Sequence, residues 1–135
     1  EHRPGTYIYM DRFQVAKGVG GYEDCALTVL ATVVSRPTEN RAIIDAGSKA
    51  LTSDTLGLSG FGLIEAYPGA EIVALSEEHG TIDLSKCATR PAIGEQLRII
   101  PNHACVVSNL FDEVTLIAGD EVVETVPVEA RGRVG

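Results

Sequence analysis

The chain has 135 residues, with 11 lysines and arginines against 19 aspartates and glutamates and a formal net charge of −8 at pH 7. This length is typical of one domain with its own core, and 44% hydrophobic with 22% charged residues is the composition of a folded rather than a disordered chain. The negative charge and the lack of a basic cluster exclude nucleic acid and anionic membranes as expected partners, because both are bound through lysine and arginine.

Compartment and processing signals are the next feature of the sequence. No apolar run approaches the ~20 residues that span a bilayer. The opening sequence has neither an initiator methionine nor a signal-peptide layout, so we expect an excised piece of a longer chain. The three cysteines, Cys25, Cys87 and Cys105, are an odd number without framework spacing. They predict reduced thiols in a cytoplasmic protein and no disulfide.

Strand-forming runs separated by turn residues dominate the chain. The first is Thr6–Met10, in which alternation places Tyr7 and Tyr9 on one face. The strongest is Cys25–Ser35, which is rich in β-branched residues and is predicted to stop before Pro37, because proline removes a ladder donor. Further strands are predicted at Arg41–Asp45, Gly62–Ala66, Glu71–Leu75, Gly80–Leu84, Gln96–Ile100, Val114–Ala118 and Val122–Val128.

The last two of these runs form the clearest hairpin, since Gly119-Asp120 has the spacing of a tight two-residue turn. Many short strands at close spacing predict an all-β domain that is mostly antiparallel and either barrel-like or a sandwich. We expect little helix, limited to a turn near Ser53–Leu56 or after His103. A single domain, residues 1–135, accounts for the whole chain.

His103 and Cys105 are the first candidates for chemistry. In an extended chain, residues two apart project to the same side, so an imidazole nitrogen and a thiolate can face one cation. Nitrogen and sulfur donors suit zinc, but two ligands fall short of the four in a structural site, and an open site indicates catalysis. The alternatives are a packed cysteine beside a hydrogen-bonded histidine, or a nucleophilic Cys105 with His103 or His79 as its base.

Two further polar clusters lie between predicted strands. In Ser76–Gly80, Glu78 and His79 are candidate catalytic residues, either orienting a metal-bound histidine or holding a general base near neutral pH. The alternative for this segment is a polar hairpin loop. The second cluster, Asp45–Ala50 together with Asp54, is dense in groups that contact phosphate or carboxylate, and its alternative is a loop with a solvated lysine.

Five segments carry a resemblance that runs from end to end of the chain: Arg3–Tyr7, Asp45–Ala50, Ser76–Gly80, Pro101–Cys105 with Asn109-Leu110, and Ala130–Arg133. In this order they resemble the C-terminal domain of the D-threonine aldolase and D-serine dehydratase family. The resemblance implies a fold-type III pyridoxal-phosphate enzyme with an N-terminal (β/α)₈ barrel that carries the Schiff-base lysine. Such a barrel typically needs about 250 residues, which this chain cannot contain.

The resemblance also implies roles for individual residues. His103 and Cys105 match the protein ligands of an active-site metal, and the softer thiolate favours Zn²⁺ over Mn²⁺ or Mg²⁺. Residues 1–10 match the strand by which the chain leaves the barrel, so that Tyr7 or Tyr9 would lie near the cofactor phosphate.

The leading hypothesis is the metal-bearing C-terminal domain of a pyridoxal-phosphate lyase that acts on β-hydroxy-D-amino acids, of the D-serine dehydratase or D-threonine aldolase type. The parent enzyme is expected to be a cytoplasmic homodimer with a small D-amino acid as substrate. The isolated chain is expected to be inactive, because the cofactor lysine would lie on the barrel. The competing hypothesis is a non-catalytic β module for small-molecule binding or subunit association.

Overall fold

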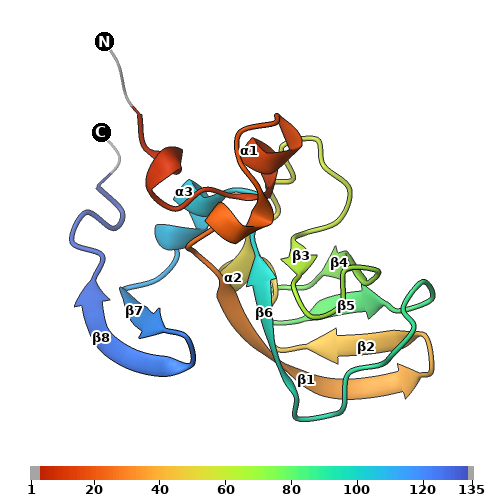
Figure 1. Ribbon diagram of the computed structural model, residues 1–135. Coiled ribbons are helices and arrows are strands. Elements are labelled where there is room, and N and C mark those ends of the chain that lie inside the picture. Colours follow the sequence, from red (N-terminus) through yellow and green to blue (C-terminus); the bar gives the residue numbers. More distant parts are fainter. Residues whose placement is uncertain (1–3, 134–135) are drawn as a thin grey trace.

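Two antiparallel sheets of unequal size make up the protein in the computed structural model, which describes residues 4–133 (Figure 1). The strands of the larger sheet are β1 (Val29–Thr38), β2 (Arg41–Ile44), β3 (Leu63–Ile64), β4 (Glu71–Leu75), β5 (Gly80–Asp83) and β6 (Gln96–Ile100). Their order is β3-β6-β1-β2-β5-β4, and the edge strands β3 and β4 also contact one another. The sheet therefore curls into a nearly closed barrel, which confirms the predicted all-β, mostly antiparallel fold and selects the barrel over the sandwich.

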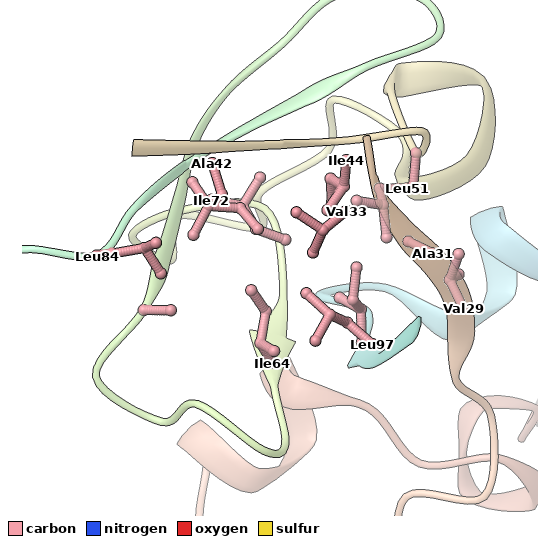
Figure 2. Close-up of a cluster of buried hydrophobic side chains, with 14 of the residues drawn as sticks. Val29, Ala31, Val33, Ala42, Ile44, Leu51, Ile64, Ile72, Leu84 and Leu97 are labelled. Carbon is pink, nitrogen blue, oxygen red and sulfur yellow. The ribbon is translucent and has the colours of Figure 1, made fainter. Parts of the chain in front are cut away.

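The barrel encloses one apolar core. Alternate residues of β1, namely Val29, Ala31 and Val33, are buried, as the period of two in a strand requires. Side chains from neighbouring strands, including Ile44 and Leu97, meet them inside the barrel (Figure 2). Full burial of each large aliphatic side chain contributes roughly 1.5–3 kcal/mol, so the inward faces of the strands hold the sheet closed.

Strand β1 continues past the proline at which it was expected to end. It reaches Thr38 and pairs with β2 through Ser35 opposite Ile43 and Thr38 opposite Arg41. Three steps along β1 thus match two steps along β2, which is the signature of a bulge. A bulge accommodates a proline within a strand because the ladder is already interrupted there. The predicted end of this strand is therefore wrong.

The strand predicted at Thr6–Met10 is also wrong. The segment is the 3₁₀ helix η1 (Thr6–Ile8), closed by backbone hydrogen bonds from Tyr9 and Met10 to the Thr6 carbonyl. Met10 then adopts a positive φ of 56°, which turns the chain into the short helix α1 (Arg12–Ala16). Residues 4–10 therefore contain no exit strand, and the remainder of that prediction, residues 1–3, lies outside the described residues.

The smaller sheet is a hairpin of β7 (Glu113–Ala118) and β8 (Glu121–Pro127), joined by Gly119 and Asp120 as predicted. It stands beside the barrel rather than within it (Figure 1). Its turn is attached to β6 by Arg98, whose Nη2 donates to the Gly119 carbonyl at 3.1 Å and to Asp120 Oδ1 at 2.8 Å.

The remaining elements are short helices. η2 spans Tyr22–Asp24, and α2 (Ser48–Leu51) comes just before the turn predicted at Ser53–Leu56. α3 (Ala104–Ser108) begins directly after His103, where a helical turn was expected. No helix within residues 4–133 is long and apolar enough to cross a membrane. All three cysteines are free, which confirms the expected absence of a disulfide.

Candidate metal centre

His103 lies at the junction between β6 and α3, with extended backbone angles of φ −137° and ψ 97°. The residue before it, Asn102, is buried and makes hydrogen bonds with both ends of its amide. Its Oδ1 accepts from Arg12 Nη1 at 3.0 Å, and its Nδ2 donates to the Gly60 carbonyl at 2.8 Å. Because a buried amide is costly to leave unpaired, these bonds fix the backbone that carries His103.

The residue after His103 is fixed by a second buried polar group. Asp11 caps α1 by accepting from Gln14 N at 2.9 Å through Oδ1, and its Oδ2 accepts from Ala104 N at 3.0 Å. α1 also donates backbone hydrogen bonds from Arg12 N to the Pro101 carbonyl at 3.1 Å. The backbone on both sides of the histidine is therefore anchored by residues from the first twelve positions of the chain.

The His103 imidazole is partly accessible and has one carboxylate partner. Its side chain is 26% exposed, and Nδ1 lies 2.9 Å from Asp54 Oδ2. This hydrogen bond, together with the one from the Leu56 backbone N–H, lowers the pKa of the Asp54 carboxyl below its ordinary value. No hydrogen bond within the described range involves Nε2 of His103, which leaves that nitrogen as the one able to bind a ligand.

Cys105 is exposed, and its Sγ lies 3.1 Å from the hydroxyl of Thr6. The residue occupies the second position of α3, so the argument from an extended chain does not describe it. The helix begins at Ala104 because its amide is capped by Asp11. His103 therefore has an extended backbone conformation, whereas Cys105 lies in the first turn of α3.

The donor set available for a metal is one imidazole nitrogen and one thiol sulfur. No cluster of three or more His, Cys, Asp or Glu side chains spaced to hold a metal is present in residues 4–133. Nitrogen and sulfur donors match the preference of zinc, and two protein ligands leave positions open for a substrate. The pair therefore fits a catalytic metal better than a structural one.

Tyr7 and Tyr9 do not share a strand face. Tyr7 lies in η1 and is 68% exposed, whereas Tyr9 follows η1 and is half-buried. η1 also contains Thr6, the partner of Cys105. Tyr7 is therefore on the same short helix that contacts the thiol, while its predicted contact with a cofactor phosphate stays a prediction.

The two other polar clusters pack against each other. Ser48 N and Lys49 N donate to the carbonyls of Ser76 and Glu77, and Lys49 Nζ lies 2.6 Å from Glu78 Oε1. The hydrogen bond to Glu78 raises the pKa of the Lys49 ammonium. His79 is exposed, and no hydrogen bond or ion pair of the described residues joins it or Glu78 to His103. Their predicted catalytic roles stay predictions.

Residues 26–117, more than half of the chain, match the family described as "Putative serine dehydratase domain". The chain belongs to the serine dehydratase domain family. A Mycobacterium tuberculosis protein of uncharacterised function is 40% identical over 128 residues, which are 91% of this chain and 96% of that protein. The resemblance seen in the five sequence segments is thereby confirmed at the level of the family.

Larger members of the family are enzymes with known names. D-threonine aldolase of Arthrobacter is 33% identical over 98% of this chain, and D-serine dehydratase of Dictyostelium discoideum is 35% identical over 89%. The crystal structure of D-threonine aldolase from Filomicrobium marinum superposes with a TM-score of 0.82 at 31% identity, covering 98% of this chain. The chain spans about a third of the length of these enzymes (34%, 34% and 36%) and corresponds to their C-terminal domain.

Two solved variants of one relative carry substitutions at a histidine and a nearby cysteine. D-threo-3-hydroxyaspartate dehydratase has been solved from Delftia. The enzyme of that name has also been solved as a histidine-to-alanine variant and as a cysteine-to-alanine variant, and the replaced cysteine lies two positions after the replaced histidine. The cysteine variant is described as the metal-free form. Both structures are 30% identical to this chain and cover 90% of it, with TM-scores of 0.78 and 0.77.

Sequence reasoning nominated His103 and Cys105 as metal ligands but missed the residues that contact them. Asp54 is 49 residues from His103 in sequence, and Thr6 is 99 residues from Cys105. Asp54 was grouped with Lys49 because the two are close along the chain, yet the fold directs them to different partners. Nothing in the local pattern signals either long-range contact.

Proposed function

We propose that this chain is the metal-bearing domain of a pyridoxal-phosphate lyase that acts on β-hydroxy-D-amino acids. The proposal is supported by the family, whose larger members include D-threonine aldolase, D-serine dehydratase and D-threo-3-hydroxyaspartate dehydratase. All three names describe cleavage or dehydration of a D-amino acid with a hydroxyl on its β-carbon. Because the chain spans only a third of these proteins, the activity is proposed for a larger assembly that contains it.

The observation that carries the proposal is the spacing of the donors. His103 and Cys105 are two positions apart, as are the histidine and cysteine replaced in the variants of D-threo-3-hydroxyaspartate dehydratase, of which the cysteine variant is described as metal-free. Both side chains reach solvent, as ligands of a catalytic metal must. A sulfur donor favours zinc over manganese or magnesium. When bound, the metal would supply Lewis-acid stabilisation of negative charge on the substrate β-oxygen.

His103 and Cys105 contribute in complementary ways. His103 binds through Nε2, because its Nδ1 is occupied by Asp54. Cys105 binds as a thiolate, so it must lose its proton when the metal enters. The Thr6 hydroxyl, 3.1 Å from the sulfur, is placed to donate a hydrogen bond to that thiolate. Two protein ligands leave room for a substrate hydroxyl in the remaining positions.

Pyridoxal phosphate is proposed to be held mainly by the part of the enzyme outside this chain. When bound, the cofactor supplies an electron sink for a carbanion at the substrate α-carbon. Of the two tyrosines nominated to contact its phosphate, we favour Tyr7, because it is 68% exposed on the same 3₁₀ helix that contacts Cys105. Glu78 and His79 are kept as proposed acid–base residues.

The assembly is proposed to be a homodimer in the cytoplasm. Free thiols at all three cysteines favour a reducing compartment. Exposed hydrophobic side chains favour a partner surface.

Metal analysis of variants tests the proposed function. The 135-residue chain, dialysed against excess zinc and washed, is expected to retain about one zinc ion per molecule, and His103→Ala and Cys105→Ala are each expected to lose it. Cys87→Ser is the matched control, since it removes a thiol without touching the site and should keep the metal. Equal zinc content in all four proteins would overturn the ligand assignment.

A further inference from the structure

We propose that Asp54 is a positioning residue that holds the His103 ring with its proton on Nδ1, so that Nε2 is the nitrogen presented to the metal. The proposal deepens the proposed function and rests on it. Its basis is the 2.9 Å contact between Asp54 Oδ2 and His103 Nδ1, which joins residues 49 positions apart. A neutral imidazole has one donor and one acceptor nitrogen, and the partner of one nitrogen decides the state of the other.

The two oxygens of Asp54 have separate partners. Oδ1 accepts from the backbone N–H of Leu56 at 3.1 Å, while Oδ2 faces the imidazole. The Asp54 amide in turn donates to the Thr52 hydroxyl at 3.2 Å. Because the loop fixes Oδ1, the carboxylate has one rotational setting, and that setting directs Oδ2 at His103.

The backbone that carries Asp54 is strained on both sides. Thr52 has φ 59° and ψ 160°, Leu56 has φ 50°, and neither is glycine. A β-branched threonine rarely adopts positive φ, and such conformations persist only where the surrounding structure imposes them. Here the loop leaves α2 at the buried Leu51, which anchors it in the core. Two of the three non-glycine residues with positive φ in residues 4–133 therefore flank this one carboxylate, and the surrounding structure holds its position at a cost in backbone strain.

The other side of the contact is equally constrained. Asn102 and Ala104, the neighbours of His103, are buried and hydrogen-bonded to Gly60 and Asp11. The backbone of His103 is therefore fixed. The nitrogen that its imidazole presents can change only if the ring rotates or the proton moves between the two ring nitrogens. A carboxylate that accepts from Nδ1–H opposes both changes.

The competing explanation is that Asp54 and His103 form a structural ion pair. The two explanations differ in whether they predict a particular nitrogen of the His103 ring to carry the proton. An exposed ion pair contributes little to folding and does not require a particular tautomer. A positioning carboxylate determines which nitrogen carries the proton even before any metal is present. The tautomer of His103 in the metal-free chain is therefore the property that distinguishes them.

Asp54→Asn is the most informative variant, because the geometry of the site predicts to which imidazole nitrogen the proton should move. The amide oxygen must stay toward Leu56 N–H, which needs an acceptor, so the amide nitrogen would face His103 Nδ1 and donate to it. The proton is then expected to move to Nε2 and to block the metal-binding nitrogen. Asp54→Ala removes the preference without reversing it and serves as the intermediate case.

The experiment combines two measurements on the 135-residue chain. Long-range ¹H–¹⁵N NMR of the metal-free protein at mildly alkaline pH reports the tautomer, and zinc titration against a chromogenic chelator reports the affinity. We expect Nδ1–H in the wild type, a shift toward Nε2–H in Asp54→Asn, and a zinc affinity lower by about 10–100-fold in Asp54→Asn and Asp54→Ala. Asp112→Ala, which removes an exposed ion pair with Arg131, is the control and should change neither.

Each outcome decides between the explanations. An unchanged tautomer in Asp54→Asn, or a changed tautomer with wild-type zinc affinity, would overturn the positioning role. If His103→Ala binds zinc as tightly as the wild type, the proposed function is wrong. The tautomer result does not depend on that outcome, because the tautomer is measured on the metal-free protein. Backbone amide spectra of every variant verify that the chain is folded.

Discussion

Cys105 differs from the other two cysteines in its surroundings. Its side chain is exposed beside the Thr6 hydroxyl, whereas Cys25 is buried and Cys87 is half-buried. Burial raises the pKa of the Cys25 and Cys87 thiols above the ordinary value. Because the thiolate is both the nucleophile and the metal ligand, these two residues are poorly suited to either task.

Thiol modification should therefore select Cys105. We expect one cysteine of the native chain to react rapidly with iodoacetamide, and all three to react after unfolding in denaturant. Cys105→Ser should abolish the rapid phase, and zinc should slow it in the wild type because the metal occupies the sulfur. Rapid modification that persists in Cys105→Ser, measured by mass spectrometry, would refute this assignment.

Substitution of Asn102 tests whether its hydrogen bonds hold the backbone next to His103 in place. Asn102→Ala removes the partners of the Gly60 carbonyl and of Arg12, so the free energy of unfolding is expected to fall by about 1–3 kcal/mol. Asn40→Ala is the matched control, because Asn40 is exposed and its side-chain oxygen accepts from the exposed Arg90 side chain. The free energy of unfolding of this variant should stay within about 0.5 kcal/mol of the wild type. Urea unfolding of the two variants gives the comparison, and equal midpoints would contradict the anchoring role of Asn102.

For single residues, the sequence allows candidate metal ligands to be nominated but does not indicate which residues contact them. His103 and Cys105 could be nominated because they are two positions apart and of the right chemical type. Asp54 and Asp11 could not, because their contacts with His103 and Ala104 span 49 and 93 residues. A pairing of that length depends on the closure of the barrel, which no local pattern encodes.

Among the elements, the barrel strands were the most predictable. Short apolar runs bounded by turn residues are a local property, and β2, β4, β5 and β6 each lie where such a run was predicted to form a strand. The N-terminal segment shows the converse. Thr6–Met10 alternates like a strand, but it has no neighbouring strand to pair with and closes into a 3₁₀ turn instead. Helix α1 was missed although its cap is local, since Asp11 accepts from the backbone N–H of Gln14 three residues later.

Gly47 shows how the α2 segment is held against the turn before β5. A Cβ at this position would lie 2.4 Å from the Glu77 carbonyl oxygen, although the backbone is extended at φ −106°. Gly47→Ala is therefore expected to separate the two segments and to lower the free energy of unfolding by about 1–3 kcal/mol. It should also weaken zinc binding, because α2 leads into the loop of Asp54.

Gly5→Ala is the control for this substitution. A Cβ there meets no atom within 4 Å, so stability should change by less than about 0.5 kcal/mol. Thermal or urea unfolding of both alanine variants decides the matter. A Gly47→Ala protein as stable as Gly5→Ala would show that the contact between the segments tolerates the added methyl.

At the scale of the whole molecule, the hairpin and the barrel are joined loosely. A groove of about 860 Å³ separates them, and the hairpin exposes Leu116, Ile117, Val122 and Val123. An isolated two-stranded hairpin is only marginally stable in water. Hydrogen exchange should therefore be faster in β7 and β8 than in the barrel, and faster still in Arg98→Ala, which frees the turn. Equal protection of hairpin and barrel amides would contradict this view.

The chain by itself should lack the complete chemistry of the enzymes it resembles. We expect the purified 135-residue chain to show no visible absorbance after incubation with pyridoxal phosphate and desalting, and no turnover of D-serine or D-threonine. The reason is that the chain spans only a third of the length of the related enzymes. Turnover by this chain alone would refute the assignment of the cofactor lysine to another part of the assembly.

X-ray absorption at the zinc edge tests the central claim most directly. For the zinc-loaded chain, the account predicts one sulfur scatterer at about 2.3 Å and nitrogen or oxygen scatterers at about 2.0–2.1 Å, with the sulfur shell lost in Cys105→Ala and the imidazole signature lost in His103→Ala. A sulfur shell that survives Cys105→Ala, or a wild-type spectrum without sulfur, would contradict it.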